Sequence, residues 1–180
     1  MTRFADPFET DVTTQSYGAG TRIDGVELVD LTRFRDEGGS MLELARFDGG
    51  GRIPGLPGFE PRQINYSTLE PGTIKAFHLH REQTDVWFVP EHDRILLVLH
   101  DVRKGSPTLG EGMRFLLGDG VSRWVRIPPG VAHGCRNVGT ATARIVYFTD
   151  RHFDPDPDRC DEGRLPWDRF GADVWETRRD

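Results

Sequence analysis

The chain has 180 residues, which is enough for one domain with its own hydrophobic core and leaves little room for two. Its 29 acidic residues outnumber the 23 lysines and arginines, and the net charge of -6 argues against nucleic acid as the main partner. No apolar stretch approaches the roughly 18 residues of a membrane span, and the N-terminus lacks the apolar core of a signal peptide. We therefore expect a cytoplasmic protein without a membrane partner.

The beginning of the chain differs from the rest. Residues 1–22 are polar without sustained periodicity, so we expect an N-terminal arm there and a single domain over residues 23–180. The glycines at 38 and 39 separate two short runs of β-forming residues, which predicts a hairpin. Residues 48–61 are rich in glycine and proline, and we expect them to form a loop.

Most of the remaining sequence consists of short β-type runs punctuated by turn signals such as Pro71-Gly72 and Gly118-Asp119-Gly120. This spacing, without a convincing amphipathic helix, predicts an all-β antiparallel sandwich or barrel. The predicted strands are residues 62–69, 73–80, 86–89, 95–102, 113–117, 124–127 and 144–148. From about residue 158 onward we expect a short helix or an irregular tail.

Histidines carry the main chemical signal. His78 and His80 are two residues apart on one predicted strand, so their imidazoles point to the same face. Asp85 follows this pair, and the proline- and glycine-rich segment 128–134 places His133 at a predicted turn. We expect the fold to bring the two segments together. The other histidines are expected to serve packing, and they are His92, His100 and His152.

The two histidine segments resemble the paired motifs of the cupin superfamily. The first contains Gly72, the His-x-His pair and Asp85, which stands where a glutamate is usual. The second is Pro128-x-Gly130-x-x-His133-x-x-x-Asn137. The resemblance implies a double-stranded β-helix, or jelly roll, whose histidines point into the barrel.

A closer resemblance covers roughly residues 25–176. Seven blocks follow in order those of the dTDP-4-dehydrorhamnose 3,5-epimerase family, and they lie at residues 36–43, 63–67, 75–78, 101–110, 127–134, 147–150 and 165–168. The chain is therefore similar to a divergent member of that family, which is built on the same jelly roll.

The resemblance implies an isomerase that inverts C3, C5 or both in a nucleotide-linked 4-keto-6-deoxy sugar, by removing a proton and returning it on the opposite face. It makes His78 the base, Asp168 the carboxylate that orients it, and Tyr147 the acid. Substrate-binding residues implied in the same way are Lys75, Gln63, Asn65, His133 with Asp101 behind it, and Glu43. The resemblance also implies a homodimer and no cofactor.

Three departures from the family keep other functions open. Asp85 stands in place of a lysine, Lys75 in place of an arginine, and Gly38 in place of an arginine in the hairpin. One alternative is a metal-dependent cupin enzyme, a dioxygenase or isomerase, with a divalent transition metal. Its ligands would be His78, His80, Asp85 and His133. The other alternative is a sugar-binding protein without catalytic activity.

Overall fold

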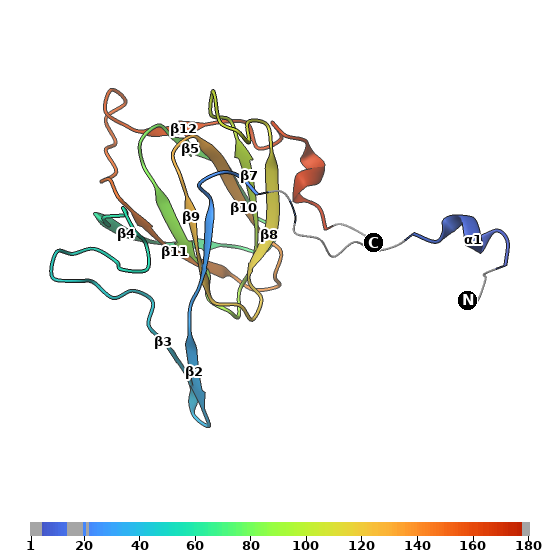
Figure 1. Ribbon diagram of the computed structural model, residues 1–180, viewed down its shortest axis with the longest axis horizontal. Coiled ribbons are helices and arrows are strands. Elements are labelled where there is room, and N and C mark those ends of the chain that lie inside the picture. The colour runs from blue at the N-terminus through green and yellow to red at the C-terminus, as the bar shows by residue number, and fades with distance from the viewer. Residues whose placement is uncertain (1–4, 14–19, 21, 178–180) are drawn as a thin grey trace.

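The computed structural model describes residues 5–13, 20 and 22–177. In this part of the chain, antiparallel strands form two five-stranded sheets and a separate hairpin, which confirms the all-β jelly roll (Figure 1). The strands are β1 (Glu27–Asp30), β2 (Arg33–Asp36), β3 (Gly39–Leu42), β4 (Gln63–Leu69), β5 (Ile74–His80), β6 (Asp85–Phe88), β7 (Arg94–Asp101), β8 (Gly112–Gly118), β9 (Arg123–Ile127), β10 (Val131–Asn137), β11 (Ala143–Thr149) and β12 (Glu162–Arg164). The helices are α1 (Phe8–Asp11) and the 3-10 helix η1 (Ala172–Trp175).

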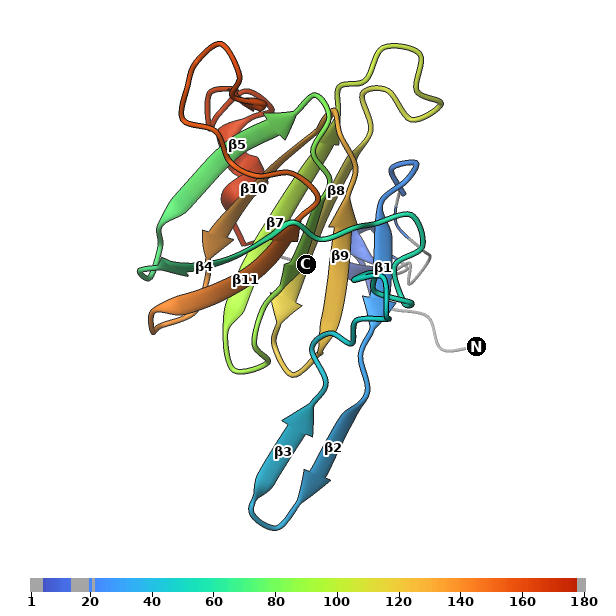
Figure 2. The same ribbon diagram turned by 90° about the vertical axis from the view of Figure 1, so that its left-hand side faces the viewer.

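The two large sheets pack face to face. The first has the strand order β1-β9-β6-β11-β4 and the second the order β12-β5-β10-β7-β8. Figure 2 shows that the β2–β3 hairpin projects away from both sheets. No helix among the described residues has the length and apolar character needed to cross a membrane.

The predicted strands and the hairpin are found close to their expected positions, but the segment that carries His133 was assigned wrongly. It was expected to be a turn, whereas the turn ends at Gly130 and strand β10 begins at Val131. This strand pairs with β7 on one side and β5 on the other, so its backbone groups are satisfied in the middle of a sheet. The short strand β12 was also missed.

Three apolar clusters hold the sheets together. The largest lies between them and contains buried side chains from both, including Leu97, Val125 and Ile145. The outer face of the first sheet is covered by the predicted loop 48–61, because Ile53, Leu56 and Phe59 turn inward. This outer cluster has seven buried side chains, and burying each of them stabilises the fold by about 1.5–3 kcal/mol.

The outer face of the second sheet is covered by the C-terminal segment. Trp175 of η1 is 1% exposed and packs against Phe77 of β5, with ring centroids 5.1 Å apart. Strand β10 reaches this cluster through Gly134, where an added Cβ would lie 2.4 Å from the Cβ of Ala76 and 2.9 Å from the indole of Trp175. The absence of a side chain at 134 therefore allows β10 to lie close against β5 beneath the indole.

Candidate active site

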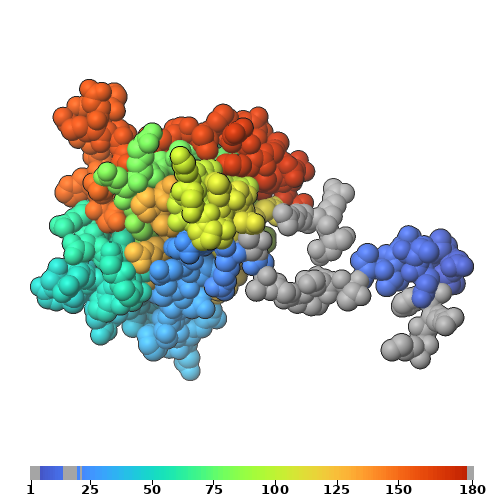
Figure 3. Space-filling model, turned by 45° about the horizontal axis from the view of Figure 1, so that its top comes forward, coloured from blue at the N-terminus to red at the C-terminus, as the bar shows by residue number. Residues whose placement is uncertain are grey.

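A cavity of about 370 Å³ lies between the two sheets, beside the central apolar cluster. Inward-facing residues of β4, β6 and β11 form one wall, and those of β5, β10 and β12 form the other. The segment between β11 and β12 contributes residues 152–154 at the rim and stands out from the surface in orange (Figure 3). The cavity thus draws on segments from residue 63 to residue 164.

Strand pairing places the two motif histidines directly opposite each other. His78 on β5 is the register partner of His133 on β10, and the register shifts by a bulge after His133. Their rings are nearly parallel, with centroids 5.9 Å apart. The predicted meeting of the two histidine segments is therefore what the structure shows.

His78 is held at both ring nitrogens. Its Nδ1 lies 2.7 Å from Oε1 of Glu162, and its Nε2 lies 3.1 Å from Nη1 of Arg164. A guanidinium only donates hydrogen bonds, so Nε2 carries the lone pair and Nδ1–H donates to the carboxylate. Burial, followed by the charges of His133 and Arg164, lowers the pKa of His78 to about 4. The ring is a neutral imidazole at neutral pH.

The carboxylate at His78 is Glu162, and the prediction that Asp168 fills this role is wrong. Asp168 lies on an exposed turn after β12, where its backbone carbonyl accepts a hydrogen bond from the N–H of Gly171. Glu162 reaches the ring because β12 pairs with β5, so that Arg164 stands opposite His78 and Glu162 opposite His80. A carboxylate two residues along the neighbouring strand falls within reach of the same imidazole.

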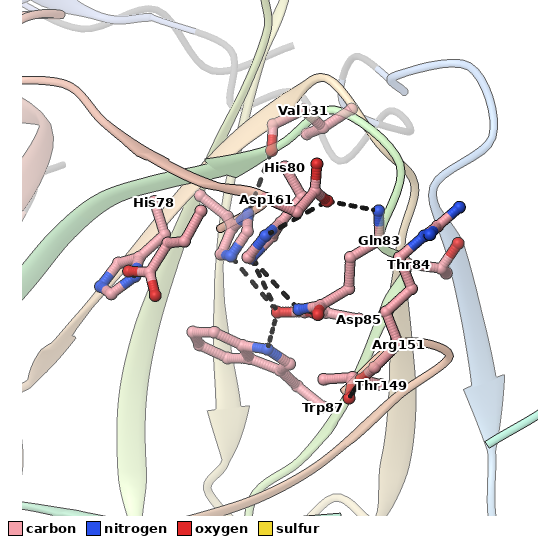
Figure 4. A network of polar contacts seen from close by, with 12 residues as sticks. His78, His80, Gln83, Thr84, Asp85, Trp87, Val131, Thr149, Arg151 and Asp161 are labelled. Atoms are coloured by element: carbon pink, nitrogen blue, oxygen red, sulfur yellow. Dashed lines mark hydrogen bonds and ion pairs between the residues drawn. The ribbon is translucent and has the colours of Figure 1, made fainter. Parts of the chain in front are cut away.

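A second group of polar side chains lies deeper in the cavity. Nε2 of His133 is 3.4 Å from Oδ2 of Asp85, and Nε2 of His80 is 4.0 Å from the same oxygen. Figure 4 shows Gln83 and Trp87 directed at this carboxylate, while His78 stands apart from the group. Of the four proposed metal ligands, the structure therefore brings three together.

Asp85 is buried and ionised. Burial alone would raise its pKa, but the hydrogen bond and charge of His133, the charge of His80 and the hydrogen bond from Gln83 hold the pKa below its usual range. Burial lowers the pKa of His80, against the opposing effect of Asp85. The group therefore combines a fixed negative charge on Asp85 with an imidazole, that of His80, which favours its neutral form.

Tyr147 enters the cavity from the opposite sheet. It lies on β11, and its ring centroid is 6.1 Å from that of Trp87. Burial, followed by the nearby charges of Asp85 and Glu162, raises its pKa, so the hydroxyl keeps its proton at neutral pH. This is the protonation state that a general acid needs.

Three other predicted binding residues also line the cavity. Lys75 donates from Nζ to the hydroxyl of Ser67 and to the carbonyl of Thr68, both at 3.2 Å. Gln63 and Asn65 lie on β4 and share a hydrogen bond of 2.7 Å between their amides. The ammonium group and both amides are therefore available to a ligand in this cavity.

Asp101 and Glu43 lie elsewhere in the described chain. The buried carboxylate of Asp101 accepts hydrogen bonds from Arg103, Ser106 and Thr108, so it fixes the turn after β7 and does not support His133. His133 instead directs its Nδ1 to the backbone carbonyl of Val131, 3.0 Å away. Glu43 is partly exposed and pairs with Arg46.

Several residues of the site carry no clear signal in the sequence. Glu162 and Arg164 alternate around Gly163, which is a strand-like pattern, but the run is too short to stand out. His152 was expected to serve packing, yet it lines the cavity. Gln83, Trp87 and Asp161 are ordinary in type, and the contacts that give them importance come from distant segments.

Comparisons with known proteins place this geometry in a family. The family model for dTDP-4-dehydrorhamnose 3,5-epimerase matches residues 20–168. The spore coat polysaccharide biosynthesis protein SpsL of Bacillus subtilis (strain 168) is 40% identical over 147 residues, which cover 81% of this chain and 91% of that protein.

Solved structures agree with this match. A dTDP sugar isomerase from Desulfovibrio desulfuricans G20 is 30% identical, with a TM-score of 0.69 over 82% of this chain and 87% of that one. A 3,5-epimerase from Legionella pneumophila Philadelphia 1, in complex with dTDP-4-keto-L-rhamnose, is 27% identical, with a TM-score of 0.66 over 81% and 74%. These relatives do not favour a metal-dependent dioxygenase or isomerase as the overall function. The chain belongs to the dTDP-4-dehydrorhamnose 3,5-epimerase family.

Proposed function

We propose that the enzyme inverts C3, C5 or both in a nucleotide-linked 4-keto-6-deoxy sugar. Membership of the family makes the chain a carbohydrate epimerase, and the Legionella relative supports the substrate class through its bound dTDP-4-keto-L-rhamnose. The single observation that carries the mechanism is the placement of His78 and Tyr147. They reach the same cavity from opposite sheets, so a sugar between them has a base on one side and an acid on the other.

His78 is the base in this proposal. The 4-keto group acidifies the neighbouring C–H bonds, and the lone pair on Nε2 accepts the proton that leaves. Glu162 keeps the proton of the neutral ring on Nδ1 and stabilises the imidazolium that forms. Arg164 must first leave Nε2, and its side chain, 61% exposed, has room to do so when a substrate enters.

Tyr147 is the acid that returns a proton to the opposite face of the carbanion. Its proton comes from a hydroxyl whose raised pKa keeps it protonated until the transfer. In the intermediate, negative charge collects on the ketone oxygen, and a well-placed donor contributes about 3–4 kcal/mol to its stabilisation. Lys75 supplies positive charge in the same cavity. Side chains alone carry both protons, so no cofactor takes part in the proton transfers.

We also propose that the enzyme is a cytoplasmic homodimer. The β2–β3 hairpin projects from the domain, and Phe34 and Met41 on it are each 59% exposed. A second copy of the chain would cover these side chains on association, which favours dimer formation. Light scattering coupled to size-exclusion chromatography measures the mass, and replacing both side chains with serine is expected to shift it toward the monomer.

The direct test is incorporation of solvent hydrogen. Incubation of the enzyme with dTDP-4-keto-6-deoxyglucose in heavy water is expected to place deuterium at C3, C5 or both, as followed by proton NMR and mass spectrometry. The labelled positions identify which carbon is inverted. A tightly bound sugar without deuterium at either carbon would instead establish the sugar-binding alternative. The wild-type chain without substrate and a boiled sample provide the background.

A further inference from the structure

Three buried side chains of the cavity direct their donor atoms toward one point. Ligand atoms of His80, Asp85 and His133 all lie within 4.8 Å of one another, and each residue is at most 9% exposed. In a tetrahedral zinc site with bonds of about 2.1 Å, neighbouring ligand atoms are about 3.4 Å apart. The separation of Nε2 of His133 from Oδ2 of Asp85 is 3.4 Å. One pair thus has the spacing of a coordination site, and Nε2 of His80, 4.0 Å from the same oxygen, needs a small inward movement.

The orientation of His133 points an electron-rich ring nitrogen at this point. Its Nδ1 lies 3.0 Å from the carbonyl oxygen of Val131, an atom that only accepts, so Nδ1 carries a hydrogen and donates it. In the neutral ring Nε2 then presents a lone pair to the carboxylate of Asp85. Two electron-rich atoms facing each other in a buried space repel. A cation held between the two atoms removes this repulsion.

His80 is arranged in the same way. The amide nitrogen of Gln83 is identified by its 2.7 Å contact with Oδ1 of Asp85, and the same nitrogen lies 3.3 Å from Nε2 of His80. Nε2 of His80 therefore also carries a lone pair, and Nδ1 carries the hydrogen. This Nδ1 is buried without a hydrogen-bond partner and lies 3.9 Å from Oδ2 of Asp161. A slight movement of the ring toward a bound ion leaves Nδ1–H directed at an anchored carboxylate.

Outer contacts hold all three residues in these orientations. Asp85 accepts hydrogen bonds from Gln83 and from the indole of Trp87. Asp161, which faces His80, accepts three backbone hydrogen bonds, from residues 81, 82 and 83. Metal-binding histidines commonly donate their other N–H to a carbonyl or carboxylate, and the metal-binding carboxylate is itself hydrogen-bonded. His133 and Asp85 have such outer contacts, whereas Nδ1 of His80 lies 3.9 Å from Oδ2 of Asp161, which Figure 4 shows beside it.

We propose that His80, Asp85 and His133 bind one divalent transition-metal ion through two imidazole nitrogens and one carboxylate oxygen. This donor set suits Zn(II), Fe(II), Mn(II) or Ni(II). His78 is outside the set because its ring stands apart from these three residues (Figure 4), so it stays available as the base. The role of the ion rests on the proposed function: bound here, it supplies positive charge for the ketone oxygen of the substrate.

Metal binding is tested without substrate. Protein with its affinity tag removed is dialysed against EDTA and then against metal-free buffer, and Co(II) is added while visible absorption and heat of binding are recorded. We expect one Co(II) per chain, with absorption bands of low-symmetry nitrogen and oxygen coordination. We also expect inductively coupled plasma mass spectrometry to find about one transition-metal ion per chain in protein that has not been dialysed.

Variants locate the ion. Asp85→Asn is expected to weaken Co(II) binding by more than 100-fold, and Asp161→Asn by about 10–100-fold through the orientation of His80. His78→Asn and the surface variant His92→Asn are expected to bind Co(II) like the wild type. Because a variant can lose its fold, circular dichroism is recorded for each one. The wild type provides an independent readout, since Co(II) should raise its melting temperature in proportion to the logarithm of the metal concentration.

Two results would overturn the site. One is a wild-type chain that takes up less than a tenth of an equivalent of Co(II) and shows no visible bands. The other is equal Co(II) binding by the wild type and a folded Asp85→Asn variant. Failure here is separable from failure of the proposed function. Deuterium incorporation by metal-free enzyme keeps the epimerase and rejects the catalytic role of the ion, whereas metal binding without incorporation keeps the metal site and rejects the epimerase.

Discussion

The interior between the two sheets has two regions built from the same strands. In one region, Ala143 of β11 and Val131 of β10 belong to an apolar cluster and lie outside the cavity lining. Four residues further along β11 and two further along β10, Tyr147 and His133 line the cavity. Strand periodicity determines that all four side chains point inward, and it is the same in both regions. The difference shows that side-chain type decides whether the interior is filled by packing or stays hollow and polar.

The two regions also contribute differently to stability. Buried apolar side chains favour the folded state, whereas buried polar groups favour it only when they are hydrogen-bonded. His80 with its unpartnered Nδ1 therefore lies in a region that was not optimised for stability. Substitutions in the cavity should change activity more than stability, and substitutions in the apolar region should do the opposite.

The largest effect is expected from removing the base in the polar region. His78→Asn should reduce deuterium incorporation at the sugar carbons by about 1000-fold or more, because no other group takes its place at the C–H bond. The melting temperature should stay close to that of the wild type, since His78 lies outside the apolar clusters. Calorimetry and NMR on the same sample check both expectations. Incorporation at the wild-type rate would remove His78 from the mechanism.

The converse substitution lies in the apolar region. Leu97 is fully buried between the sheets, and Leu97→Ala should lower the free energy of unfolding by about 2–5 kcal/mol through the cavity it creates. Below the unfolding transition, incorporation per folded molecule should be unchanged. Urea denaturation measures the first quantity. A large loss of activity in folded protein would show that the two regions are coupled.

An intermediate effect is expected from Glu162, which orients the base. Glu162→Gln should lower incorporation by about 10–100-fold, because an amide does not stabilise the imidazolium as a carboxylate does. Asp168→Asn is the matched control at the position that the sequence resemblance favoured. It should have wild-type activity because Asp168 is exposed and the carboxylate that contacts His78 is that of Glu162. The reverse ranking of these two variants would restore Asp168 as the partner.

The smallest effect concerns a charged group outside both regions. The hydrogen bond from Arg103, with further ones from Ser106 and Thr108, holds the pKa of Asp101 far below its usual range. A pKa lowered by folding stabilises the protein above the unfolded value of about 4, and this stabilisation is lost as the pH falls below it. We expect Asp101→Asn to flatten the decline in unfolding free energy between about pH 4 and 2, by on the order of 1 kcal/mol. Denaturation curves across that range provide the measurement.

The sequence was sufficient for the parts of the site that lie on one or two strands. His78 and His80 share a face because of simple alternation, and their meeting with His133 followed from the paired motif. Most strands were also found, since alternation and turn signals are local properties. The turn assigned to the His133 segment was wrong because proline and glycine end at Gly130, and the residues after it had no alternation to identify them as a strand.

The parts that depend on distant pairing could not be predicted in this way. Glu162 contacts His78 across 84 positions in the sequence, through a three-residue strand whose partner nothing local reveals. Asp168 lies in a block that resembles the family, which made it the expected partner of His78, yet its side chain is on an exposed turn. Similarity of a block establishes descent more securely than it assigns the partner of a side chain.

The late position of β12 in the chain has a consequence during synthesis. The strands that enclose the apolar cluster are complete once residue 149 has left the ribosome, and the outer cluster on β5 still awaits Trp175. A nascent chain can therefore begin to collapse with a basic imidazole that has neither its carboxylate nor its guanidinium. The last few dozen residues to be translated turn a folding intermediate into a catalyst.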